Sequence, residues 1–124
     1  MKEKTILIAD DAAFMRKMIR STLTAAGYSS FIEAKNGAEA VKLFASEDPD
    51  LVMLDVTMPE MDGLEALKRI IAISPTAKVI MCSAIGQDGT IMEAVRSGAS
   101  DFIVKPFKKE QLADMVTNLL GSGE

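Results

Sequence analysis

Five polar side chains stand directly after apolar runs of this sequence. Asp10 and Asp11 follow the first run, and Asp55, Ser83 and Lys105 each follow a later one. If these runs are parallel strands of one sheet, the polar side chains meet at its carboxyl edge. Open α/β folds bind their ligands in the crevice at that edge. The spacing therefore predicts a single site built from segments that lie far apart in the chain.

Three carboxylates gathered at one edge would repel one another. At a separation of about 4 Å and an effective dielectric constant near 20, each close pair costs on the order of 4 kcal/mol. A cation must offset that repulsion, and Lys105 is one candidate. Mg²⁺ is the other, because it binds one or two carboxylates together with water and phosphate oxygens. These residue types indicate phosphoryl chemistry on a carboxylate.

Asp55 is the candidate nucleophile. It ends the apolar run at residues 51–54, and a carboxylate can take up a phosphoryl group as an acyl phosphate. Phosphoryl transfer asks of a protein mainly positioning and charge neutralisation. Any one of these polar residues could instead be a solvated charge or a cap at a strand end. Their occurrence together favours a site.

Four segments of the chain resemble the receiver domains of bacterial and archaeal response regulators. They are residues 8–16 (IADDAAFMR), 55–63 (DVTMPEMDG), 82–86 (CSAIG) and 98–107 (GASDFIVKPF). They occur in the family's order and at its spacing, and they span nearly the whole chain. The first and third segments are most similar to the single-domain chemotaxis branch of this family.

The resemblance implies a doubly wound, flavodoxin-like α/β fold, with a five-stranded parallel sheet in the order 2-1-3-4-5 and five helices. It also implies a phosphorylation switch rather than an enzyme. A CheA-like histidine kinase would phosphorylate Asp55 in the presence of Mg²⁺, and slow self-dephosphorylation or a dedicated phosphatase would reverse the reaction. The phosphorylated form would bind a FliM-like flagellar switch protein. We expect a cytoplasmic monomer that binds neither nucleic acid nor membrane.

The family's motifs also imply a role for each matching position of this sequence. The metal ligands would be Asp10, Asp11, Asp55 and the backbone carbonyl of Thr57. Ser83 and Lys105 would bond the phosphoryl oxygens, and Phe102 would be the aromatic residue that turns inward on activation. The output face that binds the partner would contain Ile91, Met92, Val104 and Phe107.

Two of these positions have ordinary alternatives. Lys105–Pro106 resembles the family's cis peptide, which turns the lysine back into the crevice, and only X–Pro bonds populate cis at modest cost. A trans proline ahead of the last helix is the alternative. Many chemotaxis receivers carry Tyr where this chain has Phe102, so no hydroxyl is present to bond a partner. A plain hydrophobic residue on an edge strand is the alternative there.

Composition places the chain among ordinary globular domains. It has 124 residues, of which 48% are hydrophobic and 26% charged, with a net charge of −4. The acidic balance argues against nucleic-acid binding, which usually requires a basic patch. No apolar run approaches the roughly 20 residues that cross a bilayer, and the N-terminus lacks a secretion signal. The single cysteine, Cys82, suits a reducing cytoplasm, and we expect it to be buried.

Histidine is absent from the chain. This excludes metal sites built on imidazole and Ser-His-Asp hydrolysis. Any phosphohistidine in the chemistry of this protein must therefore come from another protein.

Apolar runs of four or five residues alternate with helical patterns, which is typical of βαβ units and a parallel sheet. We expect one domain over residues 1–124, with a flexible tail at 121–124. Strands are expected at 5–9, 30–34, 51–54, 78–82 and 101–104. Helices are expected at 13–26, 38–47, 63–73, 90–97 and 109–120. The first helix should turn Phe14, Met18 and the Thr22–Leu23 pair towards the core, and Asn36 should cap the second.

Three alternatives from other classes or pathways need weighing. A haloacid-dehalogenase-like phosphatase needs a second Asp two residues after its nucleophile, where this chain has Thr57. In a flavodoxin-like electron carrier, Asp10 and Asp11 would repel the phosphate of FMN, and Tyr28 alone is a poor substitute for a flavin-stacking Trp. A receiver of another pathway, such as a sporulation-type relay or a truncated transcription factor, stays open. The lack of a second domain in this sequence favours a stand-alone role.

Overall fold

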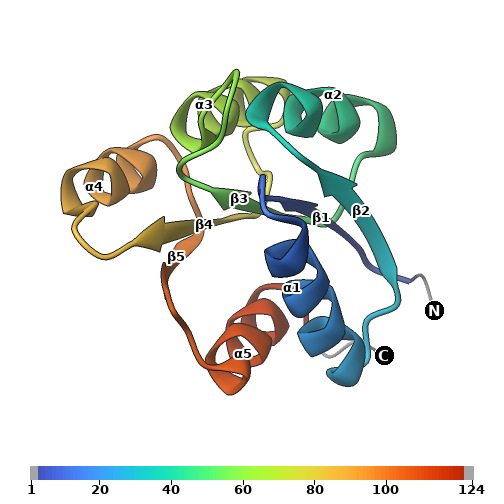
Figure 1. Cartoon of the computed structure of the whole chain (residues 1–124). Coiled ribbons are helices and arrows are strands. Elements are labelled where there is room, and N and C mark those ends of the chain that lie inside the picture. The colour runs from blue at the N-terminus through green and yellow to red at the C-terminus, as the bar shows by residue number, and fades with distance from the viewer. Residues whose placement is uncertain (1–2, 122–124) are drawn as a thin grey trace.

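The computed structural model describes residues 3–121, which form five strands alternating with five helices (Figure 1). The strands are β1 (Thr5–Ala9), β2 (Ser30–Ala34), β3 (Leu51–Asp55), β4 (Val79–Ala84) and β5 (Asp101–Lys105). The helices are α1 (Ala13–Ala25), α2 (Gly37–Glu47), α3 (Gly63–Ile73), α4 (Asp88–Arg96) and α5 (Lys109–Leu120). Each expected element is present, with ends within two residues of the predicted ones. The tail expected at 121–124 lies, apart from Gly121, outside the described residues.

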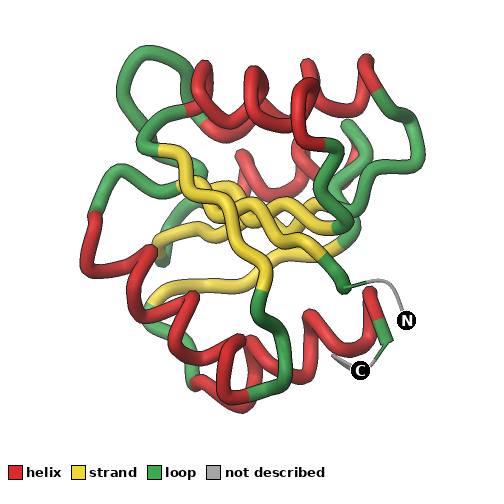
Figure 2. Tube along the Cα trace, turned by 90° about the vertical axis from the view of Figure 1, so that its right-hand side faces the viewer, coloured by secondary structure: helices red, strands yellow, loops and turns green. Residues whose placement is uncertain are grey.

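The five strands form one parallel sheet in the order β2-β1-β3-β4-β5. Helices cover both faces, so the molecule has three layers (Figure 2). Helices α1 and α5 pack on one face, and α2, α3 and α4 pack on the other. This is the doubly wound α/β fold that the resemblance implied, with the predicted strand order.

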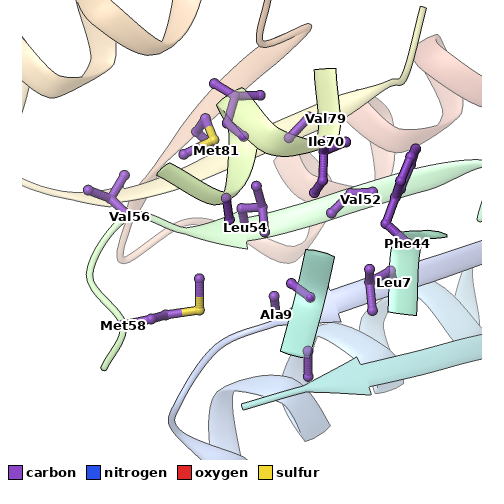
Figure 3. Close-up of a cluster of buried hydrophobic side chains, with 14 of the residues drawn as sticks. Leu7, Ala9, Phe44, Val52, Leu54, Val56, Met58, Ile70, Val79 and Met81 are labelled. Carbon is purple, nitrogen blue, oxygen red and sulfur yellow. The ribbon is translucent and has the colours of Figure 1, made fainter. Parts of the chain in front are cut away.

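The core consists of two clusters, one on each face of the sheet, because successive side chains of a strand point to opposite faces. Leu7 and Ala9 of β1 pack into the cluster under α2, α3 and α4, and Figure 3 shows this cluster. Ile6 and Ile8 pack into the cluster under α1 and α5. Strands β1, β3 and β4 are covered on both faces, and this explains why their sequences are almost continuously apolar.

Two capping residues fix the loops at the carboxyl edge of the sheet. Asn36 accepts a hydrogen bond from the backbone N–H of Glu39 (2.7 Å), as predicted, and begins α2. Asp62 accepts one from Glu65 (2.9 Å) and begins α3. A capping side chain satisfies one of the free N–H groups of a helix's first turn. The loops after β2 and β3 therefore end at defined points beside the strand ends.

The expected inward face of α1 was partly wrong. Its buried residues are Ile19, Thr22 and Leu23, whereas Phe14 is 74% exposed. The inward stripe runs back through Met15, which packs against the core and lies one turn before Ile19. Phe14 lies about 100° round the helix from Met15 and therefore faces solvent.

Within residues 3–121, no helix combines the length and the apolar character that crossing a membrane requires.

Gly63 sits where the β3–α3 loop returns against its own strand. A Cβ atom there would lie 2.1 Å from the backbone oxygen of Asp55, which cannot move without disturbing β3. We expect Gly63→Ala to lower the free energy of unfolding by about 1–3 kcal/mol, the usual range for overpacking. Urea denaturation measures the change.

Gly89→Ala is the matched control for Gly63→Ala. Gly89 also lies in the first turn of a helix, but a Cβ atom there would have open space around it, apart from its chain neighbours and the backbone of its own helix. The substitution should leave stability unchanged or raise it by up to about 1 kcal/mol, because Ala is the better helix former. Equal effects at the two positions would show that the close approach at Gly63 is relieved by a shift of the loop.

Candidate functional site

Three carboxylates meet at the carboxyl edge of the sheet. Asp10 directly follows β1, Asp11 is next to it, and Asp55 ends the neighbouring strand β3. Each offers a carboxylate oxygen, and these oxygens lie within 4.8 Å of one another. Asp10 is buried, Asp55 is partly buried and Asp11 is exposed, so the cluster is open to solvent at Asp11. Carboxylate oxygens at this spacing could hold a hard divalent cation.

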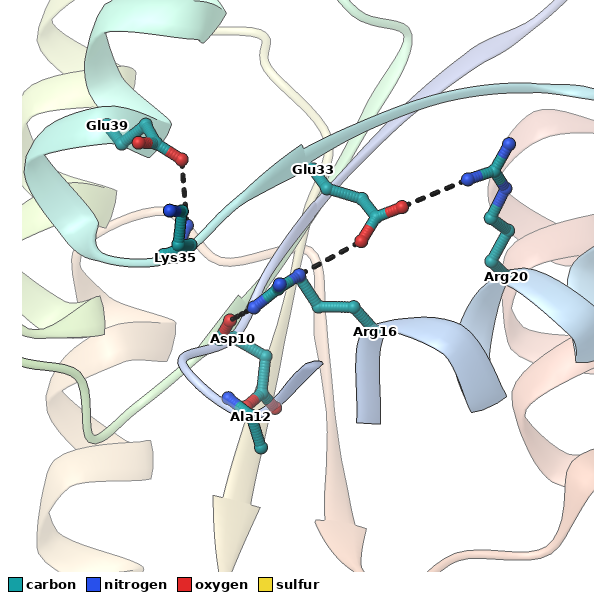
Figure 4. A network of polar contacts seen from close by, with 7 residues as sticks. All are labelled: Asp10, Ala12, Arg16, Arg20, Glu33, Lys35 and Glu39. Carbon is teal, nitrogen blue, oxygen red and sulfur yellow. Dashed lines mark hydrogen bonds and ion pairs between the residues drawn. The ribbon is translucent and has the colours of Figure 1, made fainter. Parts of the chain in front are cut away.

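Asp10 is held by its neighbours on both sides of the carboxylate. Its Oδ1 accepts a hydrogen bond from the backbone N–H of Ala12 (2.9 Å), seen in Figure 4. Its Oδ2 accepts one from the ammonium group of Lys105 (2.8 Å). The backbone N–H of Asp10 donates to the carbonyl oxygen of Ala34 (3.1 Å) at the end of β2. The side chain therefore has little freedom to turn away from the cluster.

Lys105 joins two of the three carboxylates. Its ammonium group lies 2.8 Å from Asp10 and 3.2 Å from Asp55, although β4 separates β5 from β3 in the sheet. Partial burial by itself would lower the pKa of Lys105, but hydrogen bonds and charge interactions with Asp10 and Asp55 outweigh burial and raise it. The lysine therefore stays charged. The Lys105–Pro106 peptide is cis, as the resemblance implied.

The pKa of Asp55 is raised although Lys105 lies beside it. Burial and the charge of Asp10 raise the pKa of Asp55 above its ordinary value of 3.8. The charge and hydrogen bond of Lys105, and the backbone N–H of Thr57, act in the opposite direction without cancelling the rise. Burial is the larger of the two causes of this rise, and Lys105 offsets the rise only in part. A further positive charge beside Asp55 would stabilise its ionised form.

Ser83 lies at the same edge of the sheet, at the far side of Asp55. Cys82 pairs with Asp55 in the register of β3 and β4, which places Ser83 one residue beyond it. Ser83 is only 1% exposed and lines a cavity of about 360 Å³ beneath α4. Phe102, 41% exposed on β5, lines the same cavity. Ser83, the expected phosphoryl ligand, and Phe102, the aromatic residue expected to turn inward, thus line the same cavity.

The residues expected to form the output face do not all lie together. Met92 and Val104 are exposed and line the cavity beneath α4. Ile91 contributes to its wall but is only 8% exposed, since it packs into the core. Phe107 does not line this cavity and packs against the cluster under α1 and α5. Phe107 follows the turn at the end of β5, and the turn carries it to the other face of the sheet.

Gln87 is a contact residue that sequence reasoning missed. Its Nε2 donates to Oγ1 of Thr57 (3.1 Å), and its Oε1 accepts from the backbone N–H of Ala84 (2.6 Å). The side chain therefore ties the loop after β3 to the end of β4. A polar residue at the start of a helix is too common to be a signal, so the sequence alone does not mark it.

The raised pKa of Asp55 has a consequence for stability. Because the folded-state pKa lies above the unfolded one, the ionised carboxylate destabilises the fold at neutral pH. We expect Asp55→Asn to raise the melting temperature by a few degrees at pH 7 without divalent metal. The gain should shrink at about pH 4, where the wild-type carboxyl also takes up its proton. Thermal unfolding at the two pH values measures it.

Asp114→Asn is the control for this stability prediction, because Asp114 is an exposed aspartate on α5 away from the cluster. It should change the melting temperature little at either pH. An Asp55→Asn variant that is less stable than wild type at pH 7 would show that the attraction of Lys105 outweighs burial and repulsion.

Comparison with known proteins matches this chain to one family. Residues 6–117 match the family model of the response regulator receiver domain. The chain is 48% identical to the chemotaxis protein CheY of Thermotoga maritima, over 94% of this chain and 97% of that protein. It is 50% identical to CheY of Bacillus subtilis, over 93% of this chain and 96% of that protein.

A solved structure agrees with the sequence relatives. The crystal structure of the CheX–CheY–BeF3–Mg²⁺ complex from Borrelia burgdorferi contains a chain that superposes with a TM-score of 0.89 at 34% identity. The match covers 94% of this chain and 89% of that one. Fold, strand order and sequence point the same way, and the chain belongs to the response regulator receiver domains of two-component systems, among relatives named for chemotaxis.

Proposed function

We propose that this receiver domain accepts a phosphoryl group on Asp55 and works as the stand-alone response regulator of a chemotaxis pathway in the cytoplasm. The observation that carries the proposal is the meeting of three carboxylates with one lysine at the carboxyl edge of the sheet. Receiver domains act as phosphorylation switches and not as classical enzymes. The phosphoryl donor would be the phosphohistidine of a CheA-like kinase, since this chain contains no histidine.

Charge at the site favours Mg²⁺ as the partner of this reaction. Three negative charges against one positive charge leave a formal charge of −2, which a divalent cation would balance. Asp10, Asp11, Asp55 and the backbone carbonyl of Thr57 would hold the ion. When bound, it would neutralise the carboxylates and the incoming phosphoryl oxygens, which is the main requirement of phosphoryl transfer.

The transfer itself asks little of the other residues. An oxygen of Asp55 would form the bond to phosphorus while the phosphorus–nitrogen bond of the donor breaks, and the imidazole nitrogen would keep the electron pair. Lys105, already 3.2 Å from Asp55, would then donate a hydrogen bond to the phosphoryl oxygens, which carry the negative charge. Thr57 stands two residues after Asp55 and supplies no carboxylic acid. Self-dephosphorylation would therefore be slow.

The switch would connect Asp55 to the cavity beneath α4. The added phosphoryl group would draw the hydroxyl of Ser83 towards it, and Ser83 lines that cavity together with Phe102. Inward rotation of Phe102 would then change the apolar surface around Met92 and Val104. The identity to CheY relatives supports a FliM-like flagellar switch protein as the partner. The Borrelia complex of CheX with CheY supports a CheX-like protein as a second partner. A dedicated phosphatase and a monomeric state also belong to the proposal.

Asp55→Asn should abolish phosphorylation by acetyl phosphate with Mg²⁺, because an amide cannot form the acyl phosphate. Intact mass spectrometry measures it: wild type gains one phosphoryl group and the variant gains none. Asp114→Asn, on the exposed face of α5, should be phosphorylated like wild type. Phosphate retained by the Asn variant would rule out Asp55 as the acceptor.

Phe102→Trp should report the switch, since the chain contains no other Trp. Its emission should change when beryllofluoride and Mg²⁺ are added to mimic the phosphoryl group, and the change should be lost with Ser83→Ala. A complete shift between two states would need about 5.5 kcal/mol of differential interaction, so we expect a partial one. Emission that ignores the mimic, in a variant that still binds it, would make Phe102 an ordinary edge-strand residue.

A further inference from the structure

Arg16 is an almost buried arginine one turn into α1, with a side chain only 13% exposed. Its Nη1 donates to the backbone carbonyl oxygen of Asp10 at 2.7 Å, and its Nε donates to Oε1 of Glu33 at 2.9 Å (Figure 4). Oε2 of Glu33 accepts in turn from Arg20 at 3.1 Å. The guanidinium group therefore connects the segment after β1 with the edge strand β2.

We infer that Arg16 is a positioning residue for the metal site, acting through the backbone of Asp10. The inference rests on the proposed function, because it concerns the cation that Asp10, Asp11 and Asp55 would hold. Glu33 orients the guanidinium group, and the guanidinium group fixes the carbonyl of Asp10. That contact sets where the two neighbouring carboxylates stand before any ion arrives.

The position of the contact distinguishes it from an ordinary ion pair between a helix and a sheet. β1 ends at Ala9, so the carbonyl of Asp10 lies beyond the strand ladder, where Arg16 donates to it. The carboxylate of Asp11 has no hydrogen-bond partner among the described residues. Two contacts therefore restrain the peptide units on either side of Asp11: Arg16 holds the carbonyl of the Asp10–Asp11 peptide, and Oδ1 of Asp10 holds the N–H of the Asp11–Ala12 peptide.

The charge of Arg16 also fits this role. A free positive charge beside three carboxylates would compete with a metal ion, but Glu33 lies 2.9 Å from Arg16 and offsets part of its charge. The contribution of Arg16 is then mainly the direction of its hydrogen bonds. A planar guanidinium group donates in two fixed directions, which an ammonium group cannot reproduce. Residues that orient metal ligands without touching the metal typically change affinity by about 10–100-fold when they are replaced.

Arg16→Gln separates positioning from charge, because the two effects have opposite signs. Loss of a positive charge near the cluster would by itself tighten Mg²⁺ binding. Loss of the restraint on Asp10 should weaken it, and we expect an affinity about 10-fold lower. Isothermal titration calorimetry with Mg²⁺ measures the affinity directly. The Mg²⁺ concentration that gives half the maximal rate of phosphorylation by acetyl phosphate should rise by about the same factor.

Arg20→Gln is the matched control. Arg20 pairs with the same Glu33 and lies 5.8 Å over the ring of Phe31, but it does not contact Asp10. It should keep the wild-type Mg²⁺ affinity within about twofold. Arg16→Lys keeps the charge without the planar group and should also bind Mg²⁺ more weakly. It serves as the second variant in case Arg16→Gln does not fold.

The outcomes are distinguishable. Weaker Mg²⁺ binding by both Arg16 variants, with Arg20→Gln unchanged, supports the inference. Wild-type or tighter affinity in the Arg16 variants, with a lower melting temperature in the absence of metal, makes Arg16 a structural residue only. Equal weakening in Arg20→Gln assigns the effect to the shared contact of α1 with Glu33 rather than to the bond between Arg16 and Asp10, and overturns the inference. If wild type binds no Mg²⁺, or Asp11→Ala binds it equally well, the proposed metal site fails and this inference with it.

Discussion

Repulsion among Asp10, Asp11 and Asp55 is the constraint on which the carboxyl edge of this fold depends. The sheet order places β1 beside β3, so their acidic ends cannot avoid each other. Lys105 lies within 3.2 Å of two of the carboxylates, yet the pKa of Asp55 remains raised. Burial and the charge of Asp10 both disfavour the ionised form of Asp55, and a cation bound at this edge would favour it.

The loops around the site hold the acids together at a cost in stability. Gly63 lets the loop after β3 return onto its own strand, and Gly37 allows an equally close approach to the backbone of Met61. Glu60 adopts a left-handed backbone conformation (φ 66°), and its carboxylate accepts a hydrogen bond from Asn36 (3.0 Å). Such conformations persist where the surrounding structure determines them, and they concentrate at functional sites.

Polar chemistry and apolar recognition occupy adjacent parts of the molecule. The acidic cluster lies at the strand ends, and the cavity beneath α4 lies between β4, β5 and that helix. Ser83 belongs to the edge that carries Asp55 and also to the wall of the cavity. A change at Asp55 could therefore reach the cavity through Ser83 alone, at the end of β4. Gln87 bridges Thr57, in the loop after β3, and Ala84, at the end of β4. Its side chain would have to adapt if Ser83 moved towards a phosphoryl group.

The sequence by itself determined the strands, the helices and the strand-end positions of the acids, because apolar runs, caps and the polar residues that end them are local patterns. The order of the strands came from the resemblance to receiver domains and was confirmed. Only the tertiary structure decided which face of α1 is buried, that Phe107 lies away from the cavity, that Glu33 of β2 orients Arg16, and that Gln87 reaches Thr57 in the loop after β3. These features depend on the rotation of each helix against the sheet and on contacts between residues distant in the chain, which no local pattern records.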